Sequence, residues 1–146
     1  MMTEYFLDTS FIMALLLDSD SNHKKAVNLA YVLNEKCYIN NNILNEVLTL
    51  TGRKLNISAA REVYYNLIDT FEVLNEYEIP NYTSENFRIF ETYIGINSKK
   101  TKLSFTDSSI ILTMKEFNIF NLVSFDKEFE KIENIDLIQK LQPTNH

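Results

Sequence analysis

The stretch Glu4–Leu17, EYFLDTSFIMALLL, joins two apolar runs through a short polar corner. The first run, at 5–7, is typical of a buried strand, because strands of parallel sheets are continuous hydrophobic segments. The second run, at 11–17, follows Asp-Thr-Ser at 8–10, residue types that favour a helix start. Ligands of open α/β sheets bind outside the carboxyl ends of strands, so Asp8 stands at a candidate site. The alternative is that Asp8 only caps the helix.

The alternation of apolar strands and amphipathic helices continues along the chain. We predict further strands at 36–40, 71–74, 119–123 and 135–138. We predict helices over 22–34, 43–52, 59–70, 84–94 and 107–117, with caps at 40–42, Ser58 and Thr106 and an end at Gly52. Such alternation indicates an α/β fold with a parallel sheet, helices on both faces and right-handed crossovers.

Composition restricts the classes of site. The chain has 146 residues, which suits one domain, and we expect this domain at 1–142 with a frayed tail at 143–146. Two glycines argue against a glycine-rich phosphate loop. A single cysteine, Cys37, excludes an internal disulfide framework and a cysteine-rich zinc site, and its apolar neighbours predict a small buried side chain.

No apolar stretch reaches the length of a membrane span, and the N-terminus lacks a signal-type pattern, so we expect a cytoplasmic protein without a membrane partner. The net charge is −6. A protein that binds nucleic acid through its overall field should be basic. Any nucleic-acid binding by this chain must therefore be local and helped by cations.

Four acids share a position relative to the predicted sheet: Asp8, Glu46, Asp107 and Asp126. Each follows a strand or begins a helix, so all four are expected at the carboxyl edge. Acids gathered without a basic partner repel one another, and a hard divalent cation such as Mg²⁺ or Mn²⁺ relieves this repulsion. The alternatives are a solvated helix residue for Glu46, a first-turn acid for Asp107 and a turn residue for Asp126.

Four segments, FLDTSFIMALL, NEVLTL, LSFTDSSIILTM and LVSFDKEFEKI, carry these acids in order. Together they resemble the four acidic motifs of PIN domains, most closely those of small single-domain toxins of the VapC type. The resemblance covers nearly the whole chain. It implies a PIN-like α/β/α sandwich whose parallel sheet has the order 3-2-1-4-5. One departure is that Ser108 and Ser109 replace alanines common in the family, which we expect to affect helix packing more than chemistry.

The resemblance also implies an Mg²⁺- or Mn²⁺-dependent ribonuclease that leaves 5′-phosphate and 3′-hydroxyl ends. Its catalytic residues would match Asp8, Glu46, Asp107 and Asp126. The three aspartates would be the metal ligands, and Glu46 would position or deprotonate the attacking water. Substrate contacts are predicted for a second set, which could instead be helix or turn caps and a solvated loop: Thr9, Ser124, Lys99, Lys100 and Lys102.

The sequence leaves several functions open. A phosphatase of the haloacid dehalogenase type needs an aspartate where this chain has Ser10. A receiver domain needs paired acids near its first strand and a lysine after a late strand, and the sequence offers no convincing position for either. A housekeeping PIN nuclease for RNA processing and a non-catalytic PIN binding module are not excluded. A toxin would have an antitoxin partner and often forms a homodimer, with surfaces from aromatic-rich helices: Tyr64, Tyr65, Phe87, Phe90 and Tyr93.

Overall fold

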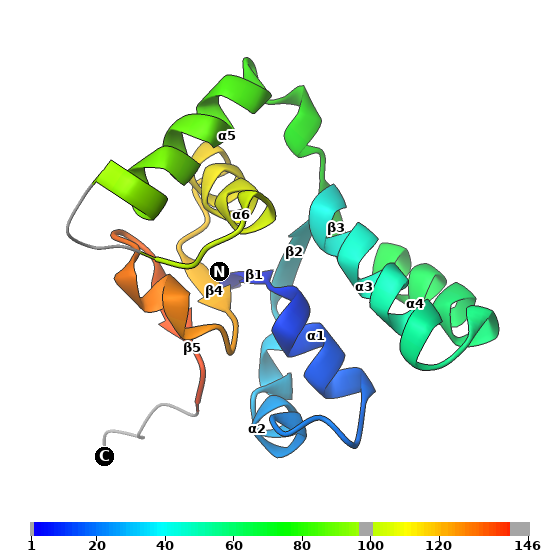
Figure 1. Cartoon of the computed structure of the whole chain (residues 1–146). Coiled ribbons are helices and arrows are strands. Elements are labelled where there is room, and N and C mark those ends of the chain that lie inside the picture. Colours follow the sequence, from blue (N-terminus) through cyan, green and yellow to red (C-terminus); the bar gives the residue numbers. More distant parts are fainter. Residues whose placement is uncertain (1, 97–100, 141–146) are drawn as a thin grey trace, which may run out of the picture.

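The computed structural model describes residues 2–96 and 101–140, which form a parallel sheet flanked by helices (Figure 1). The strands are β1 (Glu4–Leu7), β2 (Lys36–Asn40), β3 (Glu72–Leu74), β4 (Asn121–Val123) and β5 (Asp136–Ile138). The α-helices are α1 (Thr9–Leu16), α2 (His23–Asn28), α3 (Asn41–Lys54), α4 (Ile57–Thr70), α5 (Tyr82–Glu91) and α6 (Phe105–Glu116). Short helices complete the chain: η1 (Ala30–Asn34), η2 (Glu76–Glu78), η3 (Thr92–Ile96) and η4 (Lys127–Lys131).

The strands pair in the order β3-β2-β1-β4-β5, and every pairing is parallel. The predicted α/β fold and its strand order are confirmed. β1 lies at the centre, where Tyr5 is aligned with Cys37 of β2 and Asn121 of β4. The chain turns to one side after β1 and to the other side at β4. The carboxyl ends of β1, β2 and β4 therefore meet at the switch point where ligands of such sheets bind.

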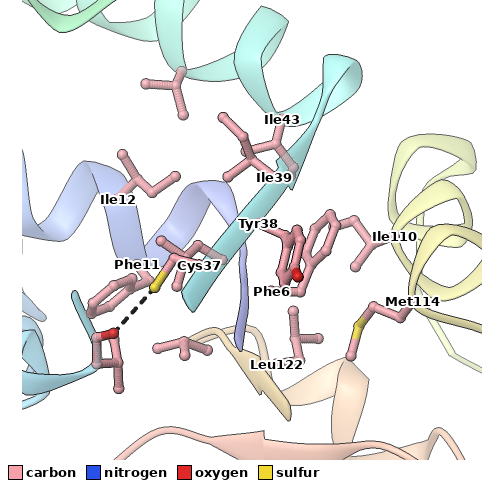
Figure 2. Close-up of a cluster of buried hydrophobic side chains, with 14 of the residues drawn as sticks. Phe6, Phe11, Ile12, Cys37, Tyr38, Ile39, Ile43, Ile110, Met114 and Leu122 are labelled. Atoms are coloured by element: carbon pink, nitrogen blue, oxygen red, sulfur yellow. Dashed lines mark hydrogen bonds between the residues drawn. The ribbon is translucent and has the colours of Figure 1, made fainter. Parts of the chain in front are cut away.

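Helices cover both faces of the central strand. Phe6 and Leu7 are adjacent in β1, so their side chains point to opposite faces, and both are fully buried. Figure 2 shows the same division in β2, where Cys37 and Ile39 face α1 while Tyr38 lies toward α6. Cys37 is buried as predicted: its Sγ donates to the carbonyl of Val32 at 3.2 Å, and burial raises the pKa of the thiol to about 12.

Several helix boundaries differ from the predictions; α5, for example, runs over Tyr82–Glu91 rather than 84–94. The helix expected over 22–34 is broken, because α2 ends at Asn28 and η1 follows. α3 continues through Gly52 to Lys54, because Gly52 does not adopt the left-handed conformation that ends many helices at a glycine. α4 is capped by Asn56 rather than Ser58, because the Asn56 side chain accepts from the N–H of Ala59 at 2.7 Å.

The predicted tail at 143–146 and most of the loop with Lys99 and Lys100 lie outside the described residues. Within the described ranges, the helices are too short or too polar to span a bilayer. The domain boundary at 142 also falls outside these ranges and stays a prediction.

Candidate active site

Asp8 follows β1 directly and precedes α1, but its side chain makes no capping bond to that helix. Its carboxylate Oδ2 instead accepts from the hydroxyls of Ser124, at 2.6 Å, and Ser10, at 2.8 Å. Only 6% of the residue is exposed. The interpretation of Asp8 as merely a helix cap is therefore wrong, because the carboxylate faces Ser124 at the end of β4.

Burial is the main cause that raises the pKa of Asp8. The hydrogen bonds from Ser124 and Ser10 act against it, while the negative charge of Asp107 raises this pKa further. Taking a carboxylate out of water disfavours its charged form, and a like charge adds to this cost. A bound proton or cation at the carboxyl of Asp8 would therefore reduce the electrostatic repulsion and stabilise the folded protein.

Glu46 is half-buried in α3, a helix that packs against α1. Its pKa is raised to about 7, first by burial and then by the charges of Asp8 and Asp107. The helix begins at a fixed point: Asn40 accepts from the N–H of Ile43 at 3.0 Å and donates to Thr113 of α6 at 3.1 Å. Glu46 is consequently held near the other acids rather than on a fully solvated face.

Asp107 lies in the first turn of α6, where it forms two hydrogen bonds with Ser104. Its carboxylate accepts from the N–H of Ser104 at 3.0 Å, and its own N–H donates to the Ser104 hydroxyl at 3.0 Å. This capping box makes Ser104 the cap, so the prediction of Thr106 is wrong; the Ser-x-x-Asp spacing was the signal. The pKa of Asp107 is raised, mainly by burial and also by Asp126, against the hydrogen bonds from Ser104.

Asp126 precedes η4, and its Oδ1 accepts from the N–H of Glu128 at 3.0 Å. The link to Asp8 is Ser124, which is fully buried. The Ser124 hydroxyl donates to Asp8, accepts from the N–H of Asp126 at 3.0 Å and lies 3.2 Å from the hydroxyl of Ser10. This chain of bonds fixes the Asp126 turn against the end of β1.

Ser10 is a contributor that the sequence analysis missed as a site residue. It donates to Asp8, and its hydroxyl accepts from the N–H of Phe125 at 3.0 Å. The D-x-S spacing at 8–10 was an available signal, because the side chain two positions into the helix start reaches back to the acid. Thr9 lies between them, and its buried hydroxyl is the only side-chain polar atom of the described residues that is buried without a hydrogen-bond partner.

Of the three predicted lysines, only Lys102 lies within the described residues. Lys102 is exposed, and its N–H donates to Glu128 Oε2 at 3.3 Å. Its charge is among those that lower the pKa of Glu128, after Lys131. Lys99 and Lys100 fall within 97–100, outside the described residues.

The donor set suits a hard cation in kind. Carboxylates and hydroxyls offer oxygen ligands, which Mg²⁺ and Mn²⁺ prefer, and a basic side chain is not among the causes of the described shifts in Asp8, Glu46 and Asp107. Within residues 2–96 and 101–140, no group of three or more Asp, Glu, His or Cys side chains is close enough together to hold a metal ion by itself. Mg²⁺ commonly keeps several waters and takes only one or two carboxylates, so the type of donor fits.

The sequence matches the PIN domain over residues 5–135, while no curated protein matches it. Several solved structures share its fold. The sarcin-ricin loop cleaving toxin VapC20 of Mycobacterium tuberculosis has a TM-score of 0.72 and 23% identity, covering 86% of this chain and 92% of its own. VapBC2 of Rickettsia felis, bound to a promoter DNA fragment, has a TM-score of 0.67 and 16% identity, and the match covers 93% of this chain and 98% of the other. A toxin-antitoxin complex from Klebsiella pneumoniae has a TM-score of 0.65 and 16% identity, and the match covers 90% of this chain and 95% of the other.

The family match spans most of the chain, from β1 to the residue before β5, and includes all four acids. This chain therefore belongs to the PIN domain family.

Proposed function

We propose that this protein is a divalent-metal-dependent endoribonuclease that hydrolyses RNA phosphodiester bonds, and that it is the toxin of a type II toxin-antitoxin pair. The observation that carries the proposal is that a PIN domain joins Asp8 and Asp126 through the Ser124 hydroxyl, with Asp8 and Asp107 close enough to Glu46 to raise its pKa. A folded protein keeps such repulsion at a functional site more readily than elsewhere.

In this proposal Asp8, Asp107 and Asp126 hold Mg²⁺ or Mn²⁺, partly through water. When bound, the ion supplies charge neutralisation at the phosphate and a more acidic water. Ser10 and Ser124 keep the carboxylate of Asp8 oriented through their hydroxyls. Thr9, with its unpaired hydroxyl beside Asp8, is a contact for substrate or bound water.

Glu46 takes the proton from the attacking water. A general base works best when its pKa lies near the operating pH, and the pKa of Glu46, raised to about 7, suits that role. Lys99, Lys100 and Lys102 guide the RNA backbone in the proposal, a role that stays a prediction.

The assignment as a toxin draws on the structural relatives. VapC20 is described as a toxin that cleaves the sarcin-ricin loop, and the Klebsiella pneumoniae structure as a toxin-antitoxin complex. An antitoxin or a second copy of this chain would meet exposed aromatic side chains of α4, where Tyr64 is 38% and Tyr65 55% exposed. A small neighbouring reading frame with a DNA-binding pattern would support the toxin over a housekeeping nuclease.

The direct test is cleavage of RNA by the purified protein with Mg²⁺ or Mn²⁺, with EDTA, and by Asp8→Asn and Asp107→Asn. We expect cleavage only by the parent with metal, while both variants stay folded by circular dichroism. Glu62→Gln, an exposed change on α4, is the purification control and should cleave like the parent. Full activity in either asparagine variant, with contaminating nuclease excluded by the mock preparation, would remove the proposed metal site.

A further inference from the structure

Four aromatic side chains line a hollow of about 790 Å³ formed by η2, the start of α5 and the start of α6. We call it the aromatic groove; its rings are Tyr77, Tyr82, Phe87 and Phe105. Three of these side chains are open to solvent: Tyr77 is 55%, Phe87 53% and Phe105 42% exposed. Large exposed aromatic surfaces that gather in one hollow are typical of a binding site.

Neighbouring rings fix the orientation of this surface. Tyr77 and Tyr82 meet edge to face with centroids 5.3 Å apart, and Phe105 meets Phe90 in the same way at 5.6 Å. Phe90 in turn lies 6.3 Å from Phe87. Such contacts stabilise ring orientations, so the groove offers flat apolar faces that need little ordering upon binding.

Hydrogen bonds of Asn42 tie the groove to α3 and α6, the helices that carry Glu46 and Asp107. Tyr77 donates its hydroxyl to Asn42 Oδ1 at 3.0 Å, and the Asn42 amide donates to Tyr82 at 3.2 Å and to Ser109 of α6 at 3.1 Å. Asn42 precedes Glu46 by four residues, which places both on one face of α3.

α6 provides the second link between the two sites. Ser109, which accepts from the Asn42 amide at 3.1 Å, lies in the same helix as Phe105 of the groove and Asp107 of the acidic cluster.

The charge of the chain indicates what these rings supply. At a net charge of −6 the protein gains little from its overall field when it binds a polyanion. Stacking of bases on aromatic side chains gives affinity without positive charge, and it requires bases that are free of a duplex. An aromatic surface beside a phosphodiester site matches this need.

We propose that the aromatic groove is a base-stacking subsite for the unpaired nucleotides next to the scissile phosphate. The inference rests on the proposed ribonuclease function, and it assigns the positioning of the RNA to Tyr77, Tyr82, Phe87 and Phe105.

The test measures binding of a short fluorescein-labelled single-stranded oligoribonucleotide by anisotropy, in an Asp8→Asn background with Mg²⁺ so that the RNA stays intact. Removing a stacking ring should weaken binding roughly 5- to 100-fold, so we expect this loss in Phe87→Ala. Phe120→Ala is the matched control, because Phe120 is 57% exposed and lies outside the groove. Tyr77→Phe keeps the ring and should bind more tightly than Tyr77→Ala.

The same oligoribonucleotide annealed to its complement should lose the difference between parent and Phe87→Ala. Equal affinities of the parent, Phe87→Ala and Tyr77→Ala for the single strand would overturn the subsite. If Phe87→Ala with Asp8 intact also cleaves RNA with the kcat/KM of the parent, the ribonuclease proposal stands and the stacking subsite falls. Weakened binding in a protein that never cleaves RNA would keep the groove as a stacking site for unpaired nucleotides and remove the ribonuclease proposal. Unchanged RNA affinity with loss of a protein partner would assign the groove to that partner and contradict the inference.

Discussion

Asp8 and Glu76 are both buried acids, yet their surroundings differ completely. Glu76, the first residue of η2, is fully buried, and its carboxylate accepts from the N–H groups of Asn41 at 2.9 Å and Asn42 at 3.0 Å. These are the first two residues of α3, where free N–H groups and the helix dipole favour a negative charge. Asp8 has two hydroxyl donors instead, and other acids for neighbours.

This comparison separates a structural acid from a candidate catalytic one. Burial alone does not distinguish them, since Glu76 is the more buried of the two. The difference is compensation: the charge of Glu76 completes the start of a helix, whereas the charges around Asp8 oppose one another. A buried acid that repels its neighbours leaves room for a cation, and one that caps a helix does not.

The largest effect is expected at Glu46, which belongs on the side of Asp8 in this comparison. Glu46→Gln keeps size and helix propensity but removes a charge and a potential base. General bases contribute roughly 10²–10⁴-fold, so single-turnover RNA cleavage should fall by that order with the fold intact. Glu46→Asp should also be impaired, because a displacement of about 1 Å can cost on the order of 10²-fold.

Glu62→Gln is the matched control, because Glu62 is an exposed helical glutamate on α4. Cleavage at the parent rate by both Glu46 variants under saturating metal would remove Glu46 from the site and leave three aspartates.

The next largest effect is expected on stability, at Glu76. Glu76→Gln turns one N–H acceptor into an NH₂ donor and weakens bonds that involve a charge, so we expect a loss of about 1–3 kcal/mol in the free energy of unfolding. Urea unfolding measures this loss. Below its unfolding transition the variant should still cleave RNA. Glu78→Gln, an exposed change in the same turn, should unfold like the parent. A Glu76→Gln protein that keeps its stability but loses cleavage would reverse the assignment.

The sequence predicted one side of this contrast far better than the other. The strands and their order followed from apolar runs and family motifs. Asp8 and Asp126 were predicted as acids that follow strands, and the order of the family motifs added Glu46 and Asp107. Glu76 gave no signal, since its partners are backbone groups 34 and 35 residues away. Its role depends on tertiary structure, which places η2 against the start of α3.

Caps were also difficult to place. Asn56 and Ser104 each precede the predicted cap by two residues, and several polar residues near a helix start compete for this position. The hydrogen-bonded side chain decides between them, and that depends on where the preceding loop arrives.

A smaller effect should appear in the pH dependence of the metal-free protein. The pKa of Glu46 is raised from 4.5 to about 7, so the folded state binds this proton more tightly than the unfolded state. Stability from this group is therefore fully present below about pH 4.5 and is lost as the pH rises through about 7. The raised pKa values of Asp8 and Asp107 act in the same direction.

Urea unfolding in EDTA across this pH range, for the parent and Glu46→Gln, isolates the effect as a difference. The advantage of the glutamine variant should grow with pH. A constant difference would mean that Glu46 does not feel the other acids.

The central claim is that the acids around Asp8 form one cation site, and metal binding tests it most directly. The EDTA-treated parent, Asp8→Asn and Glu76→Gln are melted near neutral pH with and without millimolar Mn²⁺. A ligand that binds only the folded state raises the midpoint by mass action. We expect a rise for the parent and Glu76→Gln and none for Asp8→Asn. An unchanged midpoint for the parent, or an equal rise for Asp8→Asn, would contradict it.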